Sequence, residues 1–161
     1  MKKNKDKKLR IGILLGRFEP FHLGHLNLIR KILSENDYLV IIIGSIQRAE
    51  NPKKKVIDML FQLQEIAEMD TYTVHAMTDP DPIDTWVEEM VSICKILGFK
   101  GTTCTLYRAD RDLDKYKDKL KKYHIRVKQV KRESFYHLAA NGIYYKASSA
   151  TEVRRIKEKA G

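Results

Sequence analysis

The stretch YLVIIIG at residues 38–44 decides the expected fold of this chain. It is an unbroken apolar run, rich in β-branched side chains, that ends at a glycine. A strand with one face in water alternates apolar and polar residues, whereas a strand covered on both faces is apolar throughout. We therefore expect residues 38–43 to form a central strand of a parallel sheet.

Strand-like and helix-like segments alternate on both sides of that run. The other expected strands are 9–15, 71–77, 102–107 and 125–130. The expected helices are 24–33, 53–69, a segment that runs to about 97, 110–122, and a last helix from about 149. Thr85 and Glu88 are expected to form a capping box at the start of the helix that runs to about 97. This alternation predicts βαβ units and a single Rossmann-like, doubly wound α/β domain, with a five-stranded parallel sheet and helices on both faces.

The composition suits one compact domain. The chain has 161 residues, of which 43% are hydrophobic, so it needs neither a disulfide nor a metal to bury a core. Its two cysteines, Cys94 and Cys104, form no CxxC pair, which argues against a zinc knuckle or a secreted disulfide framework and favours the cytoplasm. No apolar run approaches the ~20 residues of a membrane span, and residues 1–8 lack the apolar stretch of a signal peptide.

The charge balance points to anionic partners without choosing among them. Lys and Arg number 31 against 21 Asp and Glu, for a net charge of +10. Part of the excess lies in residues 1–8, which we expect to form a basic flexible tail ahead of a domain at 9–161. Another part lies in residues 115–122, at spacings typical of a solvated helix face. Nucleic acid, anionic lipid and phosphorylated small molecules would all be attracted.

A more specific signal follows the first expected strand. The stretch GRFEPFHLGH, which we call the first motif, begins at Gly16 and ends at His25. Gly16 permits a turn and a close approach at the strand end, and Arg17 offers a planar fork of donors for phosphate oxygens. His22 and His25 are three residues apart at a helix start, so they can point the same way, and Gly24 leaves room for a ligand. With the free N–H groups of the helix, these residues predict an anion cradle.

Simpler interpretations of the first motif stay open at this point. A histidine at a helix start is commonly a cap or a surface residue. A metal-binding pair would be spaced HxxH, but no third ligand stands nearby in the sequence. The chain has no GxxxxGK[ST] and no GxGxxG, so neither a P-loop kinase nor a dinucleotide oxidoreductase is supported.

The first motif resembles the GRFxPxHxGH form of the HxGH signature of the nucleotidyltransferase superfamily. Its residues are similar to the corresponding motif of nicotinamide-nucleotide adenylyltransferases, above all the archaeal type. The resemblance implies that ATP is bound by residues of this motif, namely Gly16, Arg17, Phe18, His22, Gly24 and His25.

A second motif, SSATEVRR at residues 148–155, stands near the C-terminus. Ser149 with Glu152 predicts a capping box that opens the last helix. The hydroxyls of Ser149 and Thr151, the free N–H groups of the helix and Arg154 can hold phosphates, although a plain cap with surface arginines would look the same. The segment resembles the SxTxxR signature of the same superfamily, which implies that Ser149, Thr151 and Arg154 lie on the triphosphate of ATP.

Residues between the two motifs bear on the second substrate. The stretch GSIQ at 44–47 resembles the family's GSAQ, which implies that Ser45 and Gln47 bind nicotinamide mononucleotide (NMN). Trp86 can stack on the cationic nicotinamide ring, as a tryptophan in a comparable place does in the family, or can simply pack a helix on the sheet. The chain departs from the family in KKK at 53–55 and in YRAD at 107–110.

The resemblance implies transfer of AMP from ATP to NMN, with Mg²⁺, to give NAD and pyrophosphate. His22, His25, Arg17 and Arg154 would act by positioning the substrates and neutralising charge on the phosphoryl oxygens. It also implies a cytoplasmic homo-oligomer with no membrane association. Two alternatives stay open: the same chemistry on phosphopantetheine, flavin mononucleotide or a polyol phosphate, and a non-enzymatic nucleic-acid binder, which the two motifs disfavour.

Overall fold

A computed structural model describes residues 9–18, 21–78, 83–98, 103–108, 114–131 and 133–160. The first five strands are β1 (Arg10–Gly16), β2 (Tyr38–Ile43), β3 (Tyr72–Ala76), β4 (Thr103–Arg108) and β5 (Ile125–Gln129). The helices are α1 (Leu23–Glu35), α2 (Pro52–Gln64), α3 (Ile83–Ile96), α4 (Asp114–Lys121) and α5 (Ala150–Ala160). A hairpin of β6 (Phe135–Leu138) and β7 (Tyr144–Ala147) precedes α5, and short 3-10 turns lie at Ile46–Arg48 and Met69–Thr71.

The five strands form a parallel sheet in the order β3-β2-β1-β4-β5. Strand β1 lies at the centre, where Leu14 pairs with Ile41 on one side and Tyr107 on the other. From β1 the chain proceeds first to β2 and β3 and then returns to β4, so the strand order reverses beside β1. In an open α/β sheet, that reversal opens a crevice at the carboxyl ends of the strands, where ligands bind.

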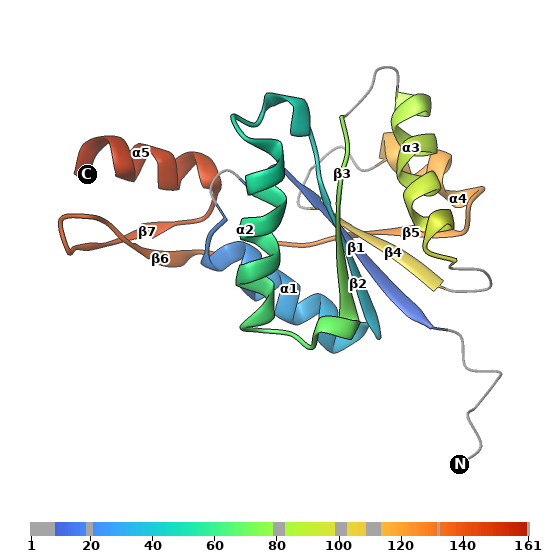
Figure 1. The fold of residues 1–161 in the computed structure, drawn as a ribbon, viewed down its shortest axis with the longest axis horizontal. Helices are drawn as coiled ribbons and strands as arrows, with labels where there is room; N and C mark the ends of the chain where they lie inside the picture. The colour runs from blue at the N-terminus through green and yellow to red at the C-terminus, as the bar shows by residue number, and fades with distance from the viewer. Residues whose placement is uncertain are drawn as a thin grey trace, which may run out of the picture.

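Helices cover both faces of the sheet, and each face has its own core. Helices α1 and α2 lie on one side and α3 and α4 on the other (Figure 1). Ile29 of α1 and Met59 of α2 belong to one buried cluster, whereas Met90 of α3 and Leu120 of α4 belong to the other. The five buried residues 39–43 divide their side chains between the two clusters, as the unbroken apolar run predicts.

Helix α1 packs unusually close to β1. A Cβ added to Gly12 would lie 2.2 Å from Cγ2 of Ile32 and 3.1 Å from Nδ2 of Asn36. No side chain fits at this position unless the helix moves. The contact therefore fixes the distance between α1 and the sheet.

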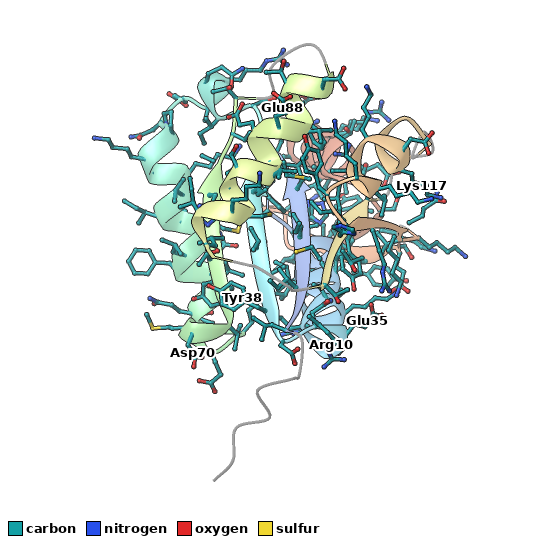
Figure 2. The ribbon with its side chains drawn as sticks, turned by 90° about the vertical axis from the view of Figure 1, so that its right-hand side faces the viewer. Arg10, Glu35, Tyr38, Asp70, Glu88 and Lys117 are labelled. Atoms are coloured by element: carbon teal, nitrogen blue, oxygen red, sulfur yellow. The ribbon has the colours of Figure 1, made fainter. Side chains whose placement is uncertain are left out.

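A polar network holds the C-terminal end of α1. The Tyr107 hydroxyl donates to Oε2 of Glu35 (2.7 Å) and accepts from Nδ2 of Asn36 (2.8 Å). Lys128 of β5 donates to the same Glu35 oxygen at 2.9 Å. Figure 2 shows Glu35 near Arg10, at the end of the sheet where β1 begins. The network thus joins the C-terminal end of α1 to β4 and β5, through the side chain of the penultimate residue of each strand.

The parallel five-stranded sheet with helices on both faces confirms the expected fold. Helix α2, expected to reach residue 69, ends at Gln64, because the chain turns there while Ile66 and Ala67 still pack against the core. The expected capping box of Thr85 and Glu88 is wrong, since α3 already begins at Ile83 and Thr85 lies inside its first turn. Residues 1–8, 102 and 110–113, which also carried expectations, lie outside the described residues.

The network at Glu35 makes a prediction about acid stability. Hydrogen bonds from Lys128 and Tyr107 hold the pKa of Glu35 below its ordinary value. Ionised Glu35 therefore adds stability above its unfolded pKa of about 4.3, and this is lost as the pH falls through the lower folded value. Glu35→Gln keeps an acceptor for Tyr107 but has no charge to titrate. The wild type should exceed the variant in unfolding free energy at neutral pH, and the difference should shrink in acid, measured by urea unfolding. An equal difference at both pH values would contradict the assignment.

Candidate active site

The first motif follows β1 directly and begins α1. Gly16 ends the strand, its carbonyl accepts from the Gly44 N–H after β2 at 2.9 Å, and His22 is the N-cap of α1. The Phe18 backbone has a φ of 53°, in the left-handed region that bulky side chains avoid. Ser45, after β2, shares this conformation with a φ of 51°. Strained backbone therefore occurs at the carboxyl ends of the two neighbouring strands, where functional sites tend to store it.

Two imidazoles cap helix α1. Nδ1 of His22 accepts from the backbone N–H of Gly24 (3.0 Å) and of His25 (3.4 Å). Nδ1 of His25 in turn accepts from the backbone N–H of His22 at 3.2 Å. This is a capping box in which histidines replace the usual hydroxyl and carboxylate.

The cap determines where the imidazole protons lie. Nδ1 of a neutral imidazole can accept from an N–H only when the ring proton is on Nε2. His22 and His25 therefore both carry the Nε2–H tautomer in this arrangement. Because Nδ1 faces the backbone at the helix start, each Nε2–H is directed away from it. The site can thus present two ring N–H donors beside the positive end of a helix dipole.

Aromatic rings hold the two imidazoles in place. The His22 and His25 rings are stacked with centroids 3.7 Å apart, and Phe135 of β6 stacks near His22 at 4.6 Å and 17°. Phe18 meets His25 edge-on at 4.8 Å, and Phe21 stacks near it at 5.5 Å. The predicted contact residue Phe18 is itself only 6% exposed. Its ring also lies over Gly16, where an added Cβ would come within 3.2 Å.

The other predicted residues of the first motif lie in different surroundings. Arg17 is exposed in the loop after β1. Gly24 lies under the rings, because a Cβ there would be 2.8 Å from Cε1 of His22 and 2.9 Å from Cε1 of Phe135. The expected room at Gly24 is thus taken by these two side chains. Residues 19–20 of the motif lie outside the described residues.

The second motif begins α5, with Ser149 in the expected capping position. Oγ of Ser149 accepts from the backbone N–H of Glu152 at 3.2 Å. This is one half of the expected capping box, and the Glu152 carboxylate accepts from the backbone N–H and the hydroxyl of Ser148. Arg154 and Thr151 are both exposed, and the guanidinium donates to the Thr151 hydroxyl at 3.1 Å. These side chains lie on the first turn and a half of the helix.

The hairpin β6–β7 brings the second motif to the first. Phe135, which stacks on His22, pairs with Ala147, the residue before Ser148. Phe135, Ala147 and Val153 of α5 form a small buried cluster. Figure 1 shows α5 along the hairpin, beside the start of α1. The two motifs, at opposite ends of the sequence, are thus joined through one phenylalanine.

The predicted residues for a second substrate lie on separate elements. Ser45 is 6% exposed at the end of β2, and the Gln47 amide donates to the Thr78 carbonyl at 2.8 Å, joining the loops after β2 and β3. Trp86 of α3 is 8% exposed and belongs to the core on that face of the sheet. The Arg108 guanidinium, at the end of β4, lies 5.8 Å from its ring centroid. Trp86 is therefore a packing residue in this structure and shows little surface to a ligand.

Two residues of the site, Phe135 and Arg108, were not predicted. Phe135 was missed because the hairpin was not expected. Asn141-Gly142 is the signal that would have revealed it, since this dipeptide between short apolar segments is typical of a tight hairpin turn. Gly142 adopts a φ of +82° there, and its N–H donates to the Ala139 carbonyl. Arg108 gave no local signal, because its contact with Trp86 depends on how α3 packs.

Within the described residues, no group of three His, Cys, Asp or Glu side chains is arranged to hold a metal ion. The backbone N–H groups, the hydroxyls of Ser149 and Thr151 and the Arg154 guanidinium are donors of the kind that bind oxyanions. No described helix combines the length and the apolar character needed to cross a membrane.

Comparison with known proteins identifies relatives. Residues 13–156 match the model of the family described as cytidylyltransferase-like. A nicotinamide-nucleotide adenylyltransferase of Thermoplasma acidophilum is 51% identical over 47 residues, which are 29% of this chain and 25% of that protein. One from Saccharolobus solfataricus is 36% identical over 75 residues, 44% of each chain. The matched segments thus span less than half the length of these curated relatives.

Solved structures share the fold. A bifunctional NMN adenylyltransferase/ADP ribose pyrophosphatase from Francisella tularensis superposes with a TM-score of 0.66 at 20% identity, over 91% of this chain and 41% of that one. The same protein complexed with AMP and a manganese ion gives 0.65 at 21% identity, again over 91% of this chain and 41% of that one. A NadR protein in complex with NR gives 0.63 at 18% identity, over 94% of this chain and 41% of that one.

The close packing at Gly24 yields a prediction. Gly24→Ala would force its methyl group against the rings of His22 and Phe135, so the rings must shift. We expect a loss of about 1–3 kcal/mol in unfolding free energy, as for other overpacked sites. Urea unfolding measures it, with Asn27→Ala on the exposed side of α1 as the control. A variant as stable as the wild type would show that the ring stack is looser than described.

Proposed function

The chain belongs to the cytidylyltransferase-like family, and from that premise we propose that it transfers AMP from ATP to NMN, giving NAD and pyrophosphate. The observation that carries the proposal is the link, through Phe135, between two helix starts, α1 with its paired imidazoles and α5 with its hydroxyls and Arg154. A polyphosphate needs many N–H and O–H donors in one place, and helix N-termini supply them. The relatives named nicotinamide-nucleotide adenylyltransferase support the choice of acceptor.

In the proposed reaction, a 5′-phosphate oxygen of the acceptor attacks the α-phosphorus of ATP. A new P–O bond forms there, the bond from the α-phosphorus to the bridging oxygen breaks, and pyrophosphate leaves with that electron pair. The substrate supplies the nucleophile, so the protein contributes position and charge. The Nε2–H groups of His22 and His25 would donate to the oxygens on which charge builds. Arg17 and Arg154, with the hydroxyls of Ser149 and Thr151, would bind the triphosphate.

We propose that Mg²⁺ enters with ATP. Mg²⁺ keeps several waters and commonly binds through substrate phosphates, so a site without a cluster of acidic ligands among its described residues suits it. The structure of the Francisella tularensis protein with AMP and a manganese ion supports use of a divalent cation. The metal would neutralise charge on the triphosphate, while the imidazoles act on the α-phosphate.

We propose that Ser45, Gln47 and Trp86 bind the acceptor, NMN. Gln47 is exposed after β2, next to the strand that leads into the first motif. With 8% of its surface exposed, Trp86 can offer a pyridine ring only an edge unless Arg108 moves from its face. The same chemistry on another phosphate acceptor is therefore the alternative that the structure favours most.

We further propose that the protein acts in the cytoplasm, as a homo-oligomer. Cys94 and Cys104 are buried and form no disulfide. Burial raises the pKa of Cys94 to about 12, so this thiol is a poor nucleophile. Buried cysteines outside any disulfide suit a reducing compartment. The oligomer rests on the resemblance to the archaeal enzymes.

The chemistry is tested first with His22→Asn. Asparagine is among the best N-cap residues, so this variant keeps an acceptor for the N–H groups of α1 while it loses the Nε2–H donor and the ring stacks with His25 and Phe135. We expect the variant to fold and kcat to fall by about 10²–10³-fold, as for loss of one oxyanion donor. Phosphorus NMR measures NAD and pyrophosphate formed from ATP, Mg²⁺ and NMN.

His124→Asn is the matched control, since His124 is exposed outside the site, and asparagine tolerates its φ of 61°. Undiminished turnover in His22→Asn would contradict the catalytic role. Wild-type turnover only with phosphopantetheine, flavin mononucleotide or a polyol phosphate would keep the chemistry and overturn the acceptor. Binding of ATP without formation of any product would contradict the proposal that the protein is an enzyme.

The acceptor side is tested with Trp86→Phe, which keeps a buried aromatic ring in the core. If Trp86 contacts the pyridine ring, the KM for NMN should rise severalfold, while the KM for ATP stays unchanged. Initial rates at varied NMN and ATP separate the two. Equal KM values for NMN in the wild type and the variant would assign Trp86 to packing alone.

A further inference from the structure

Phe135 contacts the first motif from an element far away in the sequence. It begins β6, is 6% exposed and belongs to the cluster with Ala147 and Val153 rather than to either core of the main sheet. Its ring is nearly parallel to that of His22, with 4.6 Å between centroids and 17° between planes. The capping hydrogen bonds of α1 do not involve this residue. Its contact with His22 is therefore independent of the hydrogen bonds that cap α1.

The contact encloses the His22 imidazole. One face of the ring lies on His25 at 3.7 Å between centroids, and Phe135 also stacks on the ring at a small angle. Gly24 adds to the enclosure, since the space its side chain would fill holds atoms of both His22 and Phe135. Parallel offset rings attract each other by about 0.5–1.5 kcal/mol beyond their burial. The ring plane of His22 is thus defined by its neighbours as well as by its own hydrogen bonds.

The plane of the ring decides whether a ring nitrogen can reach the cap. Nδ1 accepts from the Gly24 N–H at 3.0 Å only while the ring lies in its present plane. A 180° flip would keep that plane but place a C–H at the cap, so the hydrogen bond, and not the stack, selects Nδ1 within the plane. A stack that holds the plane therefore preserves the hydrogen bond that fixes the tautomer.

Phe135 also connects His22 to the second motif. It pairs with Ala147, and the following residues, Ser148 and Ser149, begin α5. Val153, on the inner face of α5, closes the cluster from the other side. Phe135 thus belongs to the cluster that seats α5 while its ring lies against His22.

We propose that Phe135 is a positioning residue, which holds the His22 imidazole in the plane in which Nδ1 reaches the cap of α1. Its relevance to turnover rests on the proposed function, whereas its effect on the His22 ring does not. The residue touches no substrate in this account. It acts on the reaction only through the ring that it holds.

The test compares Phe135→Leu with Val153→Ala. Phe135→Leu keeps an apolar side chain but removes the flat ring, whereas Val153→Ala weakens the same cluster from the side of α5. Two-bond ¹H–¹⁵N NMR spectra of the substrate-free protein report which ring nitrogen of His22 carries the proton, and His22→Asn assigns the signals. We expect the wild type and Val153→Ala to show the Nε2–H form and Phe135→Leu to show a mixture of forms.

The kinetic readout is a split between kcat and KM. Misplacing a catalytic group by about 1 Å can cost on the order of 10²-fold in rate, so kcat of Phe135→Leu should fall by about 10–100-fold, with little change in the KM for ATP. Phe135→Tyr, which restores a flat ring, should recover most of the rate. If Phe135→Leu fails to fold, Phe135→Met takes its place in the same comparison.

Two results would overturn the proposal. One is an unchanged Nε2–H form in Phe135→Leu or Phe135→Met, and the other is an equal loss of that form in Val153→Ala. A mixture of tautomers in Phe135→Leu, together with a wild type that forms no product with any acceptor, would support the positioning role and overturn the proposed function. The two proposals therefore fail separately.

Discussion

The hydrogen bond from the Gly24 N–H to Nδ1 of His22 is the interaction on which the site depends. A helix start needs acceptors for its free N–H groups, and serine, threonine, aspartate or asparagine commonly supplies them. Here an imidazole does so, which leaves its second nitrogen to face outward with a proton. One side chain thus completes the backbone of α1 and, in the proposed reaction, would donate to a phosphate oxygen. The cost is that the helix start loses stability whenever that ring moves.

The rest of the fold holds this helix start in place. Gly12 lets α1 approach β1 closely, and the Tyr107–Glu35–Asn36 network fixes the far end of the helix. Gly12 lies in β1, and Glu35 and Asn36 lie at the end of α1 opposite to His22, so both features set the direction of α1. The His22 cap then stands where the strand order reverses, which is where open α/β sheets bind ligands.

The main sheet and the first motif could be predicted from the sequence because both are local patterns. An unbroken β-branched run specifies β2 by itself, and the first motif needs only its place after β1. The end of α2 could not be predicted, since Ile66 continues the apolar period after the backbone has turned. The stack of Phe135 on His22 also could not be predicted, because no local sequence pattern indicates a contact between rings on elements far apart in the chain. The burial of Trp86 belongs to the same class, as it depends on how α3 lies on the sheet.

The hairpin and α5 have a small apolar cluster of their own, made of Phe135, Ala147, Val153 and the partly buried Ile156. A two-stranded hairpin is marginally stable by itself, and a cluster of this size adds little to it. The two walls of the site, the start of α1 and the start of α5, therefore differ in local stability: the start of α1 is packed on the core of the five-stranded sheet, whereas the start of α5 rests on this smaller cluster, and we expect it to be the less stable of the two. A ligand that bridges both walls would lose part of its binding energy to ordering the softer one, and its release would begin there.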